Sequence, residues 1–142
     1  MSLASMEEQG LLEPLAGTPE EVASLLETAQ RHLADAQLPG MSPQSLIVHA
    51  YHVILACATA ALRAQDWRVP NIEGKHKHTV DTLQFTLGIK PGEVKYFQTL
   101  RQKRHEDLYE GGLVASEMEA RDALEAAKNV LALAVEDLQP YL

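Results

Sequence analysis

The segment from Gln44 to about Ala64 constrains the fold more than any other stretch, because it is apolar around most of a helical circumference. Ser42 and Pro43 precede it, and this pair is typical of a helix start, with serine as N-cap and proline in the first turn. A helix with so little polar surface is stable in water only when other elements cover it. We therefore expect a long central helix surrounded by the rest of the chain.

Helix signals recur on both sides of this segment. Thr18 and Pro19 predict a helix start, with Glu21 completing a capping box, and Ser116 with Glu119 forms a second capping box. Residues 1–17 are acidic and interrupted by glycine and proline, so we expect a flexible N-terminal lead-in to a single domain over residues 18–142. The predicted fold is an all-α, antiparallel bundle of about five helices, over about residues 18–38, 44–64, 75–87, 91–110 and 116–140.

Composition agrees with this fold class. The chain has 142 residues, of which 46% are hydrophobic and only 5% aromatic, so alanine and leucine must fill the core, and this favours helices. The single cysteine, Cys57, has no partner for an internal disulfide, which fits a reducing compartment. No continuous apolar run approaches about 18 residues, and the N-terminus lacks the pattern of a signal peptide. We expect a cytoplasmic protein without a membrane partner.

The charge of the chain is unevenly distributed. The formal net charge is −8, which argues against nonspecific nucleic-acid binding by the whole surface. Between residues 37 and 115, however, nine Lys and Arg residues stand against seven acids, a local balance of +2. Five of the six histidines lie in the same region. Any cationic binding surface is therefore expected in the middle of the chain.

The stretch from Tyr96 to Gly112 concentrates these cations on one predicted helix. Its inward stripe is expected to contain Val94, Phe97, Leu100 and Leu108, and the pair Gly111-Gly112 is a natural stop signal. Arg101, His105 and Tyr109 follow at intervals of four residues and form a polar stripe. Lys103 and Arg104 lie between them in the last turns, where cations suit the helix dipole.

Together with its surroundings, this stretch resembles a HEPN domain over roughly residues 18 to 138. The order and spacing are more similar to the actinobacterial-type HEPN proteins of unassigned function than to the toxin members. The features that carry the resemblance are Ala50-Tyr51 in the central helix, the Trp67-Arg68-Val69 exit, the Gly74-Lys75-His76 turn, an Arg101-x-x-Arg104-x-x-x-x-Tyr109 helix and a last helix led by Ser116.

The resemblance implies an RNA- or nucleotide-binding protein, with weak metal-independent ribonuclease activity of toxin or stress-response type. The family signature is Arg followed after four to six residues by His, and this chain departs from it by placing Tyr109 where active members have His. In RNA cleavage Arg104 would stabilise phosphate charge, His105 would transfer protons and Tyr109 would position His105. Further phosphate contacts are expected from Arg101, Lys103, Lys75 and His76. The resemblance also implies a homodimer whose two motif helices face one cleft, and no cofactor.

Two other readings of the same residues remain open. In one, the chain is a non-catalytic protein-interaction or dimerisation module, whose Arg101 and Arg104 pair with acids of the same helix, namely Glu106, Asp107 and Glu110. In the other, the chain is a metal-dependent hydrolase that uses histidines such as His49 and His52, which are three residues apart and could share a helix face. No carboxylate lies near this pair in the helix, so no metal site is assigned.

Overall fold

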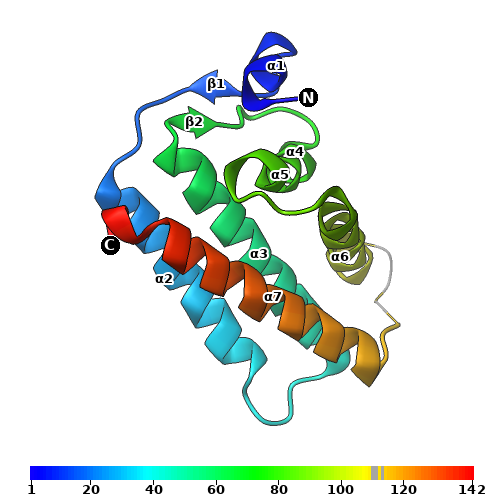
Figure 1. Cartoon of the computed structure of the whole chain (residues 1–142). Helices are drawn as coiled ribbons and strands as arrows, with labels where there is room; N and C mark the ends of the chain where they lie inside the picture. The colour runs from blue at the N-terminus through cyan, green and yellow to red at the C-terminus, as the bar shows by residue number, and fades with distance from the viewer. Residues whose placement is uncertain (110–111, 113) are drawn as a thin grey trace.

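The computed structural model describes residues 1–109, 112 and 114–142, and most of these residues are helical (Figure 1). The expected all-α helical bundle is confirmed. Within it, α2 and α3 are antiparallel, whereas α7 runs in the same direction as α3, because the segment through α4, α5 and α6 returns the chain to the start of α3 (Figure 1). The elements are α1 Leu3–Glu8, β1 Glu13–Pro14, α2 Pro19–Ala36, α3 Pro43–Ala64, β2 Trp67–Arg68, α4 Lys75–Asp81, α5 Leu83–Thr86, α6 Pro91–Tyr109, α7 Glu117–Asp137 and a 3-10 turn Gln139–Tyr141.

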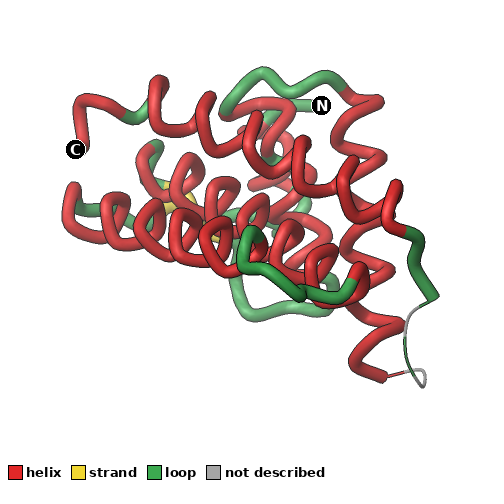
Figure 2. The backbone as a smooth tube through the Cα atoms, turned by 90° about the horizontal axis from the view of Figure 1, so that it is seen from below, coloured by secondary structure: helices red, strands yellow, loops and turns green. Residues whose placement is uncertain are grey.

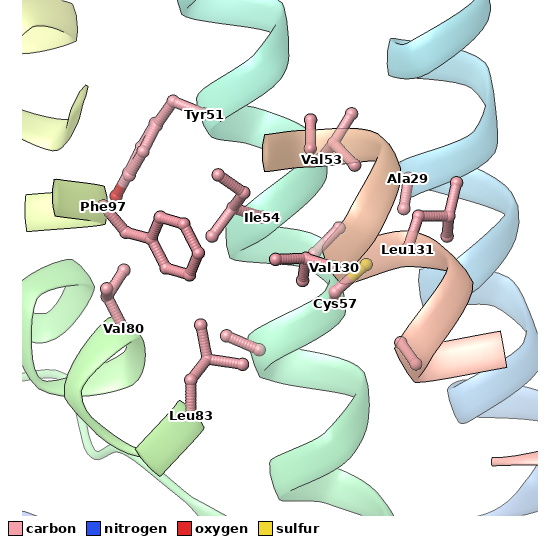
Figure 3. Packing of buried hydrophobic residues seen from close by; sticks show 14 of the residues in the cluster. Ala29, Tyr51, Val53, Ile54, Cys57, Val80, Leu83, Phe97, Val130 and Leu131 are labelled. Carbon is pink, nitrogen blue, oxygen red and sulfur yellow. The ribbon is translucent and has the colours of Figure 1, made fainter. Parts of the chain in front are cut away.

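Helix α3 is the central element that the sequence predicts. Around it lie side chains of α2, α7, α4 and α6, and Figure 3 shows Ala29, Val130 and Phe97 among them. Its Cys57 is fully buried, and burial raises the pKa of this thiol to about 12. By length and composition α3 could cross a membrane, with a mean hydropathy of 1.7 over 18 residues, of which 61% are buried inside the bundle. The sequence contains no continuous apolar run of this length, because His49 and His52 interrupt it, and α3 reaches the threshold only as an average over the window, as a buried core helix also does.

Local capping signals fix the starts of three long helices. The hydroxyl oxygens of Thr18 and Ser42 accept backbone N–H groups of the first turn, each at 3.1 Å. Ser116 and Glu119 form the complete, reciprocal capping box. Glu21 is different from the expectation: its carboxylate does not cap α2 but binds Arg63 of α3, with Oε1 2.8 Å from the arginine Nε. Glu21 therefore forms an ion pair with another helix instead of capping its own.

The first 17 residues dock closely against the domain, which differs from the expected flexible lead-in. Met6 and Leu12 are 1% and 2% exposed, and they pack with Leu62 and Val69 in a second, smaller core. Strand β1 pairs antiparallel with β2, with Glu13 opposite Arg68 and Pro14 opposite Trp67. Apolar burial and strand pairing thus hold a segment that its acidic, glycine-containing composition predicts to be loose.

Hydrogen bonds of the Arg63 side chain link this N-terminal segment to the end of α3. Besides Glu21, its guanidinium donates to the backbone carbonyls of Leu15 at 2.7 Å, Ala16 at 2.9 Å and Trp67 at 2.9 Å. Its side chain is only 7% exposed, so these bonds satisfy a buried charge. Gly17 allows the close approach, because a Cβ atom there would lie 2.3 Å from the carbonyl oxygen of Arg63.

The predicted helix from Lys75 to Leu87 is divided into α4 and α5 at Thr82. The fully buried Thr82 donates its hydroxyl to the carbonyl of Thr79 at 2.6 Å. Such side-chain bonds to the preceding turn often bend helices. The bend places α4 against both α3 and α6, and so positions the residues of its first turn near the motif helix.

Candidate phosphate-binding site

The inward face of helix α6 carries apolar side chains in its first half and arginines further along. Val94, Phe97 and Leu100 are buried at intervals of three residues. Arg101 follows Phe97 by four residues and Arg104 follows Leu100 by four, so helical geometry keeps both arginines on or beside this face. Both are partly buried. Two arginines therefore occupy positions at which the apolar spacing would place further core residues.

The expected continuation of the apolar stripe to Leu108 is wrong, because this side chain is 52% exposed. The C-terminal end of α6, next to the grey trace, projects beyond the other helices in Figure 2, so its last turns have little to pack against. The stop signal at Gly111 lies outside the described residues. Arg101 and Arg104 thus lie between the buried and the projecting parts of the helix.

The Nε atom of Arg104 is buried and has no hydrogen-bond partner among the described residues. A buried donor without a partner is uncommon, since its desolvation is not compensated. Arg104 also makes no ion pair there: the ion pairs of the described residues join Arg63 to Glu21, Arg68 to Glu13 and Lys103 to Glu119. The predicted pairing of Arg101 and Arg104 with Glu106 or Asp107 is absent from these ion pairs, and Glu110 lies outside the described part of the chain.

Tyr51 on α3 carries the second unsatisfied polar atom. Its side chain is 0% exposed and its Oη has no hydrogen-bond partner in the described structure. Figure 3 shows its ring extending from α3 toward α6, above Phe97. Burial raises the pKa of Tyr51 to about 12, although the charges of Arg101 and Arg104 act in the opposite direction. The hydroxyl is therefore protonated near neutral pH and available as a hydrogen-bond donor.

Two histidines lie close enough to Arg104 for its charge to lower their pKa values. Burial, and then Arg104, lowers the pKa of His52 on α3 to about 4. His76 at the start of α4 is exposed, but desolvation of its ring, followed by the charges of Arg104, Lys75 and Arg101, lowers its pKa as well. All the charges that shift these two histidines are positive, so the region favours an anion.

Gln98 holds Arg101 in place. Its side-chain oxygen accepts from Nε of Arg101 at 2.7 Å, and its amide nitrogen donates to the carboxylate of Asp81 at 2.8 Å and the carbonyl of Lys77 at 2.9 Å. One amide thus links α6 to α4 and orients a guanidinium at the same time. Arg101 forms no ion pair among the described residues, and its charge acts on Tyr51 and His76.

The structure separates several residues that the sequence places in one site. Lys103 lies on another side of α6 and donates to Glu119 of α7 at 2.8 Å. His105 is exposed and lines a shallow hollow of about 270 Å³ with Arg101, Gln102 and Glu106. Tyr109 ends α6, and its side chain lies outside the described residues. Arg104 and His105 therefore face different surroundings, because the first is partly buried and the second is exposed.

Lys75 and His76 border a second cavity, which is larger than the hollow beside His105. This cavity of about 390 Å³ lies between α3, α4 and the N-terminal segment, and its lining includes Arg68, Thr59 and Thr79. His76 thus lines the cavity and is also affected by the charge of Arg104. The sequence analysis missed Tyr51 and His52 as site residues, although polar aromatic side chains within an apolar helix are a usable signal.

A further group of imidazoles lies beyond His52. His32 of α2 stacks on His52 with ring centroids 5.0 Å apart, and its Nδ1 is 3.2 Å from Nδ1 of His49. Asp35 is close to both His32 and His49. These groups are potential metal ligands, and among the described residues they form the one group of three ligand atoms close enough together to hold an ion.

No family model matches this chain, and no curated protein matches it in sequence. Function must therefore be argued from the geometry and chemistry of the site.

Proposed function

We propose that this chain binds phosphate groups of RNA at Tyr51, His52, His76, Arg101 and Arg104, which we name the α3–α6 site. The observation that carries this proposal is the buried Nε of Arg104, which has no partner in the described part of the chain. A phosphate oxygen at this nitrogen would complete its hydrogen bonding and offset the charge of the two arginines. Nucleotides present the same chemical group and are the smaller alternative ligand.

The chemistry of the surrounding groups suits a phosphodiester. Arginine offers a planar, charged fork that matches phosphate oxygens, and the protonated hydroxyl of Tyr51 adds a neutral donor. His52 and His76 are neutral near pH 7, because burial and the arginines lower their pKa values, and each can gain a proton when an anion arrives. The site thus combines fixed charge with groups that adapt to the ligand.

Extended RNA fits the site better than a single phosphate does. Arg101 of the α3–α6 site also lines the hollow beside His105, and His76 of the same site also lines the cavity bordered by Lys75 and Arg68. His76 and Arg101 connect these regions. A chain of regularly spaced phosphates could therefore contact cations over all three regions, although the protein as a whole is acidic.

We further propose that the chain is a divergent HEPN-like protein with weak, metal-independent ribonuclease activity. In such cleavage the 2′-oxygen attacks phosphorus, the bond to the 5′-oxygen breaks, a base accepts the 2′ proton and an acid protonates the leaving oxygen. Arg104 would stabilise the phosphorane charge. His76 is neutral and close enough to Arg104 to serve as base, whereas Tyr51, with a pKa of about 12, is poorly suited to that role. His105 remains the candidate proposed from the sequence.

Binding of labelled single-stranded RNA in EDTA tests this function. Arg104→Ala is expected to weaken binding about tenfold or more, since a hydrogen bond to a charged group contributes about 1.5–3 kcal/mol. It should also lower the slope of log affinity against log salt by about one. Lys95→Ala removes one charge from an exposed position of the same helix and is expected to change binding much less. Equal effects of the two substitutions would contradict the proposed site.

A second candidate function is that of a dimerisation module. Leu108, Val114 and Met118 are 52%, 92% and 66% exposed, and they lie near each other in sequence around the end of α6 and the start of α7. Exposed apolar side chains in such a group favour a protein interface. We propose a homodimer, for which sedimentation of wild type beside Leu108→Lys is the test. A wild type that stays monomeric at high concentration would exclude it.

A further inference from the structure

The two long helices at the start of the domain bring three metal-ligating side chains together, separate from the α3–α6 site. His32 and Asp35 come from the last turns of α2, three residues apart and therefore on one face of the helix. His49 comes from the second turn of the antiparallel helix α3. One ligand atom from each residue lies within 4.8 Å of the other two.

The spacing of the two imidazoles fits a metal ion directly. Their Nδ1 atoms are 3.2 Å apart. Zinc binds histidine nitrogen at about 2.0–2.1 Å with tetrahedral geometry, which separates two ligand nitrogens by about 3.3–3.4 Å. The Nδ1 pair is therefore almost at the separation that one shared metal ion requires. An oxygen of Asp35 lies within 4.8 Å of the imidazole ligand atoms and has to move closer to share the same ion.

The local fold supports this arrangement. The turn after α2 returns the chain, and α3 begins at Pro43, so that His49 lies opposite the end of α2. All three side chains are partly buried, which limits competing water while leaving access for an ion. His52 stacks on His32 and restricts the orientation of that ring. The ligands are thus held by two packed helices rather than by a loop.

We propose that His32, Asp35 and His49 bind a divalent transition metal ion, with Zn²⁺ as the best fit. Two neutral imidazoles and one carboxylate are a borderline-soft ligand set that suits zinc, cobalt and nickel better than magnesium or calcium. Three protein ligands leave a fourth position for water. The bound ion joins the end of α2 to α3, so it stabilises the helix pair that forms one side of the core.

This site is independent of the proposed RNA-binding function, because none of its ligands belongs to the α3–α6 site. The two sites are nevertheless neighbours through His52, whose ring lies 5.0 Å from that of His32. Metal binding and RNA binding can therefore be measured separately, and either proposal can be contradicted without the other.

The test uses the full chain without an affinity tag, treated with EDTA and dialysed. Zn²⁺ is titrated by calorimetry, and Co²⁺ is added separately to record its visible absorption, which is strong only for a tetrahedral site. Wild type is expected to bind one equivalent and to melt at a higher temperature with Zn²⁺ than without it. His49→Ala and Asp35→Asn are each expected to weaken binding by about 10- to 100-fold.

His78→Ala provides the matched control, because it removes a histidine from the His-x-His pair at the start of α4 and leaves the cluster intact. This variant should bind Zn²⁺ as wild type does. Asp35→Asn keeps the shape of the side chain, so its effect is interpretable even where His49→Ala unfolds, and circular dichroism reports folding of each. Absence of stoichiometric binding by wild type, or binding that is lost in His78→Ala and retained in Asp35→Asn, overturns the proposal.

Discussion

Arg104 on α6 and Tyr51 on α3 each bury one polar atom that has no hydrogen-bond partner in the described part of the chain. The charge of Arg104 acts on the ionisation of Tyr51, so the two groups lie near each other across the interface between the helices. A folded protein usually satisfies such atoms, because each unsatisfied group reduces stability by about 1–3 kcal/mol. These two unsatisfied atoms are the basis of the proposed phosphate site, and their relationship gives a distinctive prediction.

Tyr51→Phe removes the unsatisfied hydroxyl and is expected to leave the free energy of unfolding unchanged or to raise it by up to about 1 kcal/mol, while weakening RNA binding. Tyr141→Phe is the matched control. Its hydroxyl donates to the carbonyl of Ala64 at 2.9 Å, so the same substitution there should lower stability by about 1 kcal/mol. Denaturant unfolding and RNA titration measure both effects. A loss of stability in Tyr51→Phe as large as that in Tyr141→Phe would contradict the assignment.

The affinity for RNA is expected to increase as the pH falls through the titration of His76. Burial and the nearby cations hold the pKa of His76 below its ordinary value in the free protein, so it is neutral at pH 7. A bound phosphodiester favours the protonated form of His76 and therefore raises its pKa. As the pH falls, the affinity for RNA rises between the higher pKa of the complex and the lower pKa of the free protein, and it is constant below the lower pKa. His76→Gln should flatten the profile. A wild-type affinity that is independent of pH would remove His76 from the site.

Stability is expected to depend strongly on the close contact between Gly17 and Arg63. Gly17→Ala would place a Cβ atom 2.3 Å from a backbone oxygen, so we expect a loss of about 1–3 kcal/mol in the free energy of unfolding. Gly92→Ala is the control, because nothing lies within 4 Å of a Cβ at that position. Denaturant unfolding compares the two. Equal stability would show that the N-terminal segment is loosely attached, as its composition alone suggests.

Local structure was largely predictable from the sequence, since it depends on residues close together in the chain. Ser42 and Ser116 cap their helices through bonds to residues three positions away. Ser42 was identified from the proline that follows it, and Ser116 from Glu119 three positions on. Glu21 shows the limit of this reasoning. It has the position of a capping residue, but its partner is Arg63, 42 residues away, and only the fold brings the two together.

The candidate site was predictable only in part, for the same reason. Arg101 and His76 were predicted as phosphate contacts and Arg104 as the group that stabilises phosphate charge, and the charges of both arginines act on His76 in the structure. In the sequence, Tyr51 contributed only to the family resemblance and His52 was considered only as a metal ligand, because the relation of both residues to α6 depends on how the two helices pack. Lys103 was predicted as a phosphate contact because it is close to the arginines in sequence. In the structure its side chain extends toward α7 and donates to Glu119.

The central claim is that Nε of Arg104 donates to a phosphate of bound RNA, and nuclear magnetic resonance of arginine Nε–H groups tests it most directly. In EDTA, the Arg104 signal, assigned by its absence in Arg104→Lys, is expected to shift and to exchange more slowly with solvent when single-stranded RNA is added, while the exposed Arg121 changes little. An Arg104 signal that stays unchanged when RNA is bound would contradict the claim. RNA would then bind elsewhere on the protein, and the buried arginine would have a purely structural role.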